Sequence, residues 1–199
     1  MAWLPPLRGV VVIVFASFAA VLGLRGLWGG PWLMEMKGLT RIEAGNLLLA
    51  CTLALTAGPA LAGFVLRRVG HGRVLLGGSH LLAAILILLI VGGGPGGFVS
   101  RAAGLPAMPA GWDLLLFVAF GLVISFQVIA FSLVRAAVPT EQAGRALSAA
   151  NLFFFLGAAV LQGISGVAAS RGGIAAALDT FAVALILCVA GFVALRPRS

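Results

Sequence analysis

Six long apolar runs dominate the hydrophobic pattern of this chain, and the short segments between them hold most of its charged, glycine and proline residues. A helix needs about 20 mainly apolar residues to cross the roughly 30 Å hydrocarbon core of a bilayer. Each run approaches or exceeds that length, so the pattern predicts an all-α membrane protein that forms one domain over residues 1–199. The predicted spans are 9–27, 41–66, 74–92, 112–134, 146–169 and 174–195.

Local signals place the ends of the first two helices. A proline lacks an N–H donor and restricts the residue before it, so Gly29–Pro31 predicts the end of the first helix. The segment 32–39 then becomes a short polar-aromatic loop, with Trp28 and Trp32 at the membrane interface. Thr40–Glu43 has the spacing of a capping box, which predicts the start of the second helix. The basic residue before the first run is also typical of a signal peptide, but the absence of a clean cleavage site favours a retained helix.

Small residues recur every fourth position in the second run, at Ala50, Ala54, Gly58 and Ala62. A stripe of this kind lets a neighbouring helix approach closely. Pro59 interrupts the same run and predicts a kink. The segment 92–111 carries several glycines and prolines with a single charge, and is predicted to be the only long loop.

The distribution of basic residues predicts an orientation. The turn Gly63–Arg73 holds three arginines and three glycines between two apolar runs. Clustered arginines favour the cytoplasmic side of a membrane, so this turn and both termini are expected there. The basic residues then expected in the cytoplasm are Arg8, Arg67, Arg68, Arg73, Arg135, Arg145, Arg196 and Arg198. Those expected outside are Arg25, Lys37, Arg41, Arg101 and Arg171.

Composition excludes several classes of function. The chain is 62% hydrophobic and 9% charged, too little charge to cover a soluble domain. Its net charge of +8 comes from arginines at the ends of apolar runs, which is a membrane-protein pattern and predicts no nucleic-acid partner. No Gly-x-Ser-x-Gly, His-Glu-x-x-His, phosphate-loop or Cys-x-x-Cys motif occurs. We therefore expect no enzyme activity, no cofactor and no metal site. Cys51 and Cys188 fall at different predicted depths, which argues against a disulfide.

The chain repeats two short patterns. Segment 43–48 at the start of the second run resembles segment 142–147 at the start of the fifth, and segments 63–70 and 166–173 share their glycines and an arginine. These matches relate runs one to three to runs four to six. Because three is odd, the second copy enters the membrane inverted, so the prediction is an inverted 3+3 repeat, as in secondary transporters.

These segments resemble the C-terminal six-helix half of a major facilitator superfamily (MFS) transporter over nearly the full length. The residues that carry the resemblance are 26–33, 44–48, 63–73 and 138–144. Within the turn, Gly63, Arg68, Gly70 and Arg73 fit or nearly fit the family's cytoplasmic gating-loop motif, Gly-x-x-x-Asp-Arg-x-Gly-Arg-Arg. Arg67 replaces the acidic residue that helps to latch the inner gate in that family.

The resemblance also implies where a substrate would bind, since the first and fourth helices of each half face the central cavity. Gln127, in the fourth run, is therefore the first candidate for a substrate contact. The other candidates are Arg25, Trp28, Asn151 and Gln162. Interhelical hydrogen bonding is the alternative role of the polar amides. For Arg25 the alternative is snorkelling to the interface from the outer end of its helix.

His80 and Asp179 are further ionisable residues within predicted spans. His80 favours a structural hydrogen bond over proton relay, and Asp179 is expected to pair with Arg25 or Arg171, or to lie at the interface.

The expected function is thus that of a secondary active transporter, or half of one, in the plasma (inner) membrane, moving a small solute by alternating access. Its expected partners are the bilayer, the solute and either a second six-helix half or a second copy of the chain. The alternatives are a non-transporting scaffold or assembly subunit, or an inactive truncated transporter. The short leader 1–7 stands where the family has a long central loop, which fits a truncation or a split gene. Neither the substrate, nor the direction of transport, nor a coupling ion is encoded in a recognisable motif.

Overall fold

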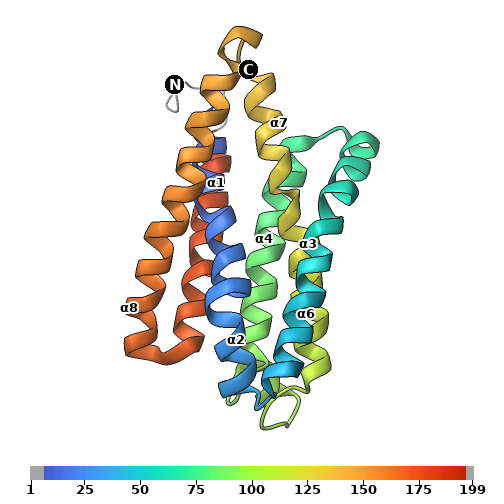
Figure 1. The fold of residues 1–199 in the computed structure, drawn as a ribbon, viewed down its shortest axis with the longest axis vertical. Helices are drawn as coiled ribbons and strands as arrows, with labels where there is room; N and C mark the ends of the chain where they lie inside the picture. Colours follow the sequence, from blue (N-terminus) through green and yellow to red (C-terminus); the bar gives the residue numbers. More distant parts are fainter. Residues whose placement is uncertain (1–6, 196–199) are drawn as a thin grey trace.

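The computed structural model describes residues 7–195, which form a bundle of long, roughly parallel helices without a strand in that range (Figure 1). The first part of the chain contains α1 (Arg8–Val21), the π-helix η1 (Leu22–Trp28), α2 (Gly29–Pro31), the π-helix η2 (Trp32–Met36), α3 (Arg41–Val69) and α4 (Gly72–Gly92). The second part contains α5 (Phe98–Ala102), α6 (Ala110–Ile124), the 3₁₀ segment η3 (Ser125–Gln127), α7 (Val128–Ala136) and α8 (Thr140–Ala194). Residues 1–6, Arg196 and Arg198, which enter the sequence predictions, lie outside the described range.

Five continuous helical stretches of the described chain are long and apolar enough to cross a membrane. They are Arg8–Met36, Arg41–Val69, Gly72–Gly92, Ala110–Ala136 and Thr140–Ala194. The predicted all-helical class is therefore confirmed for the described residues, and these helices have the length and apolar character that the hydrophobic pattern predicted for membrane spans.

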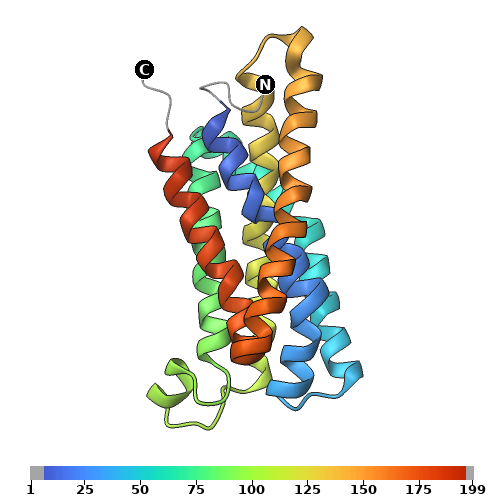
Figure 2. The ribbon, with the colours of Figure 1, turned by 90° about the vertical axis from the view of Figure 1, so that its left-hand side faces the viewer.

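The last stretch, α8, contains a sharp reversal at Gly173. This residue has φ 71° and ψ −169°, a backbone conformation that glycine adopts without a steric penalty. The chain doubles back there, so that α8 consists of two antiparallel arms (Figures 1 and 2). We call residues 140–172 its first arm and residues 174–194 its second arm. The predicted spans 146–169 and 174–195 lie on these two arms.

The predicted end of the first helix at Gly29–Pro31 is wrong, because the helical path continues to Met36. Two π-helical segments flank the proline. Local π-helical adjustments can satisfy the backbone groups that a proline frees within a membrane helix. Gly29 contributes to this geometry, because a Cβ at that position would collide with the carbonyl oxygen of Leu24. The connecting loop is accordingly shorter than predicted, and Trp32 lies on the helical path and is buried.

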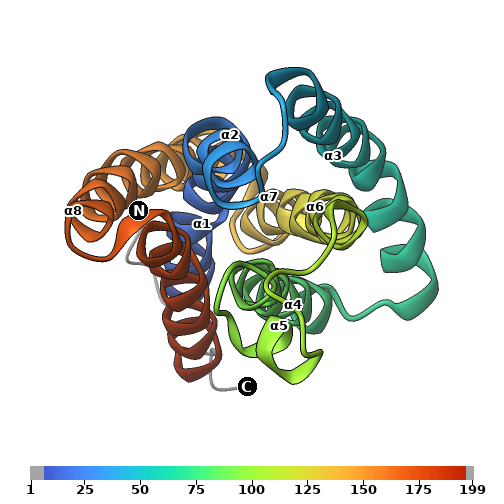
Figure 3. The same cartoon turned by 90° about the horizontal axis from the view of Figure 1, so that it is seen from below.

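Two continuous helical paths occupy the centre of the bundle when it is seen along its axis (Figure 3). One runs from α1 to η2, and the other runs from α6 through η3 to α7. On one face, α3 and the first arm of α8 flank this pair, while α4 and the second arm cover the opposite face (Figure 3). The helices α1 and α8 pack along each other, as do α3 and α6.

Small residues make these close helix contacts possible. Of the predicted stripe on α3, Ala54, Gly58 and Ala62 are buried and Ala50 is half-buried. A Cβ at Gly58 would collide with the Ser125 side chain, and a Cβ at Gly121 would lie 2.6 Å from the carbonyl oxygen of Cys51. The absence of these side chains allows α3 to lie directly against α6 and η3.

Candidate functional site

The π-helical segment η1 places Arg25 and Trp28 within the first helical path, which is long and apolar enough to span a membrane. Because this path continues to Met36, Arg25 lies about 16 Å from its end at the usual helical rise. Snorkelling is a property of basic residues near the ends of membrane helices. Arg25 is therefore not at the outer end of its helix, where the sequence had placed it. π-helical turns inside α-helices often mark functional sites.

Arg25 is half-buried and forms a hydrogen bond to α3. Its Nη1 donates to Thr52 Oγ1 over 3.1 Å, while Thr52 Oγ1 donates to the Leu48 carbonyl oxygen over 2.8 Å. The Nε of Arg25 is buried and has no hydrogen-bond partner within the described chain. The Thr52 hydroxyl group thus orients the guanidinium group, but it accepts from only one of the guanidinium N–H donors.

Trp28 connects the same segment to the first arm of α8. Its indole Nε1 donates to Ser165 Oγ over 2.9 Å, and Ser165 Oγ donates to the Gln162 carbonyl oxygen over 2.8 Å. Arg25 and Trp28 therefore tie η1 to the two helices that flank it on one face of the bundle.

Gln127 lies on a second irregular segment, the 3₁₀ turn η3 between α6 and α7. Its side chain is half-buried, and its Oε1 is buried without a hydrogen-bond partner among residues 7–195. The helix α3 contacts both irregular segments, through Thr52 at η1 and through Gly58 at η3.

The remaining two candidates lie on the first arm of α8, where Gln162 is half-buried and Asn151 is exposed. Asn151 lines an open pocket of about 410 Å³ together with Phe131, Leu147 and Ser148. It lies roughly 16 Å along the helix from Gln162, at the usual rise. The structure thus brings Trp28 close to the Gln162 backbone, and it places Asn151 at a different level of the bundle.

Gly70, Arg68 and Arg73 of the predicted gating-loop motif make structural contacts around the turn that joins α3 to α4. Gly70 adopts φ 72° and caps α3, with its N–H donating to the Leu66 carbonyl oxygen over 2.8 Å. The Arg68 guanidinium lies over the Phe64 ring at 4.8 Å from its centroid, and that of Arg73 lies over the Phe192 ring at 4.5 Å. Arg73 thereby fixes the turn to the end of α8. Gly63 of the same motif is half-buried within α3.

Sequence reasoning missed a buried ion pair between Lys37 and Asp113. Lys37 Nζ lies 2.9 Å from Asp113 Oδ2, and the two side chains are 2% and 0% exposed. Trp32 Nε1 donates to Asp113 Oδ1 over 3.0 Å. Lys37 Nζ also donates to the carbonyl oxygens of Gly93 and Met108, over 3.0 and 2.6 Å. An acid within a predicted span, which requires a partner, was the signal that could have revealed this pair.

Two other ionisable groups, His80 and Asp179, lie on the long apolar helices. His80 is fully buried, with Nε2 2.6 Å from Ser17 Oγ and Nδ1 2.8 Å from the Leu76 carbonyl oxygen, which is the structural hydrogen bonding that the sequence favoured. Asp179 is half-buried and forms no ion pair with Arg25 or Arg171. The predicted pairing of Asp179 with either arginine is therefore wrong.

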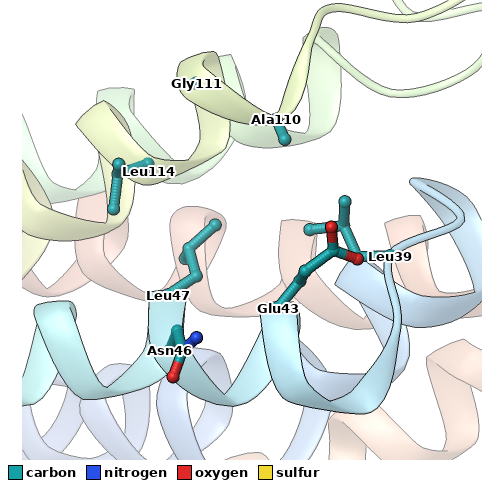
Figure 4. A pocket seen from close by; sticks show the side chains of 7 residues that line it. All are labelled: Leu39, Glu43, Asn46, Leu47, Ala110, Gly111 and Leu114. Atoms are coloured by element: carbon teal, nitrogen blue, oxygen red, sulfur yellow. The ribbon is translucent and has the colours of Figure 1, made fainter.

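A separate pocket of about 430 Å³ lies between the first turns of α3 and α6 (Figure 4). Glu43 contributes the only charged group to its lining. The Glu43 carboxylate accepts hydrogen bonds from the backbone N–H and the hydroxyl of Thr40, which completes the predicted capping box. The carboxylate therefore has a structural role, and none of the predicted substrate contacts lines this pocket. No group of three or more potential metal ligands occurs in the described part of the chain.

Comparisons with known proteins returned no match to a protein-family model, to a curated protein or to a solved structure.

Proposed function

We propose that this chain is one six-helix bundle of a secondary transporter of the MFS type, which moves a small solute across a membrane by alternating access. The observation that carries this proposal is the pair of polar groups on irregular helical segments within the bundle. Arg25 Nε on η1 and Gln127 Oε1 on η3 are buried without partners in the described chain. Solute sites of secondary transporters lie near the bilayer midplane and are built from interrupted helices.

The arrangement of the helices supports an inverted-repeat origin for the bundle. The reversal at Gly173 divides α8 into two arms, so the long helices and arms can be grouped as two sets of three. The two related segments, 43–48 and 142–147, occupy the first turns of α3 and α8. These helices flank the central pair on the same face of the bundle (Figure 3). In this proposal they are equivalent members of the two repeats.

Polar residues on that face argue for a second bundle. Arg25 and Gln162 are half-buried and Asn151 is exposed, although all three belong to membrane-length helices. Lipid cannot satisfy a charged or amide group. A second six-helix half, or a second copy of this chain, would cover these groups and close the solute site between the two bundles.

The proposal is tested by the mass of the assembly and by the flux of solute through it. Protein purified from its native membranes, together with any chain that accompanies it, should have the mass of two bundles in nanodiscs. Proteoliposomes made from the same sample should show saturable uptake of at least one member of a panel of labelled small solutes. Gln127→Ala should reduce that uptake roughly tenfold, because removal of a buried hydrogen bond to the solute destabilises its complex. Gln142→Ala, at an exposed position at the start of α8, is the matched control and should leave uptake unchanged. Absence of saturable uptake, or transport by a single isolated bundle, would contradict the proposal.

A second prediction concerns orientation. Arg68 at the end of α3 and Arg171 at the reversal of α8 are exposed at opposite ends of the bundle (Figure 1). With the Arg68 end in the cytoplasm, as the basic residues favour, Arg171→Cys should react with an impermeant thiol reagent on intact cells. Arg68→Cys should react only after permeabilisation. The unsubstituted chain is the blank, since Cys51 is buried and Cys188 is half-buried. The reverse labelling pattern would invert the orientation.

A further inference from the structure

The charge of Arg25 has no carboxylate partner. The guanidinium group of arginine carries a positive charge. The single ion pair among the described residues joins Lys37 to Asp113, and the side chain that Arg25 contacts, Thr52, is neutral. A cation held inside a membrane bundle without a counter-ion is strongly unfavourable. This charge therefore favours an anion that the chain itself does not supply.

Lys37 provides the contrast within the same bundle. An ammonium group has three N–H donors, and Lys37 directs its group at Asp113 and at two carbonyl oxygens. Its charge and its donors are therefore satisfied by the protein. The guanidinium group of Arg25 has five donors, of which one meets Thr52 and the buried Nε meets none. Of these two basic groups, Arg25 is thus the one with an N–H donor still available to bind a ligand.

The geometry around Arg25 suits an oxyanion. The hydroxyl proton of Thr52 is directed at Leu48, so Thr52 Oγ1 accepts from Nη1 and orients the guanidinium plane. An arginine with a fixed plane can form two parallel hydrogen bonds to a carboxylate or a phosphate. Trp28, on the same π-helical segment, is held in place by its hydrogen bond to Ser165.

We propose that Arg25 binds the anionic group of the solute, so that the solute is a small organic anion carrying a carboxylate or a phosphate. That this anion is carried across the membrane rests on the proposed transport function, whereas its binding at Arg25 does not.

Equilibrium binding to the purified full chain tests this inference. Thermal unfolding in nanodiscs would be followed during titration with sodium succinate and with sodium phosphate, at constant ionic strength set by sodium chloride. At least one of the two should stabilise the protein saturably. Arg25→Gln should weaken the apparent affinity roughly tenfold or more, since hydrogen bonds between charged groups are lost. Arg171→Gln, which removes an exposed arginine from α8, should leave the affinity unchanged. The inference would be overturned if neither anion stabilises the unsubstituted protein. It would also be overturned if Arg25→Gln is stabilised with the same apparent affinity as the unsubstituted protein.

A second variant keeps the test valid if Arg25→Gln does not fold. Thr52→Asp places a carboxylate at the atom that Arg25 already contacts, and so supplies the missing counter-ion. This variant should unfold at a higher temperature than the unsubstituted protein without added anion, and should lose the response to succinate or phosphate. An unchanged response would refute the assignment.

The two proposals fail in different ways. Anion binding that depends on Arg25 but produces no flux would contradict the transport function and support this inference. Saturable flux of a neutral solute that is unaffected by Arg25→Gln would overturn this inference and support the transport function.

Discussion

Asp113→Ala is expected to lower the free energy of unfolding by about 3–5 kcal/mol, because it leaves the Lys37 ammonium buried without its counter-ion. The two side chains are 0% and 2% exposed, so water cannot replace the lost partner. Trp32 loses its acceptor in the same variant, since its Nε1 donates to Asp113 Oδ1. Reversible unfolding in detergent micelles, followed by tryptophan fluorescence, would measure the change.

Two controls separate this effect from a general loss of an acidic residue. Glu35→Ala removes an exposed carboxylate from η2 and should change the free energy of unfolding by less than about 0.5 kcal/mol. The double variant Lys37→Met with Asp113→Leu replaces the buried ion pair by apolar groups and should recover much of the loss, since such replacements are often neutral. A small effect of Asp113→Ala, equal to that of Glu35→Ala, would show that the pair contributes little to stability.

Gly157→Ala is expected to destabilise the bundle by about 3 kcal/mol, through overpacking at the contact between α1 and α8. A Cβ at Gly157 would collide with the backbone carbonyl group of Phe15. The atom in the way belongs to the backbone, so a rotamer change cannot relieve the collision and the two helices must separate. The same micelle unfolding measurement applies.

Gly163→Ala is the matched control on the same arm of α8. A Cβ at Gly163 would meet no atom within 4 Å, and the position is exposed. Alanine is a better helix former than glycine, so this variant should gain about 0.5–1 kcal/mol. The two substitutions are therefore expected to have opposite signs. Equal effects would mean that the close approach of α1 and α8 does not limit stability.

Some features of the site were predictable because they depend on residue type within one run. Arg25 and Gln127 were identifiable as polar groups in apolar segments, and such groups are rare unless they have a role. Their depth and partners were not identifiable. The depth of Arg25 depends on the continuation of the helix past Pro31, which a proline normally argues against.

The sequence by itself determined the helical class, the membrane-length apolar runs and the local ends of several helices. The capping box of Thr40 and Glu43, the left-handed Gly70 and the reversal at Gly173 all arise from interactions within a few residues. Local backbone preferences and the length of an apolar run do not depend on which helices are neighbours, so a linear pattern contains them.

Only the tertiary structure decided the polar contacts between helices. Trp28 and Ser165 are 137 residues apart in sequence, and Trp32 and Asp113 are 81 apart. The apolar runs resemble one another in composition, so the hydrophobic pattern does not predict which helices are neighbours. The path through Pro31 also depends on neighbours, because a π-helical turn is retained only where packing and new hydrogen bonds compensate for the lost α-helical ones.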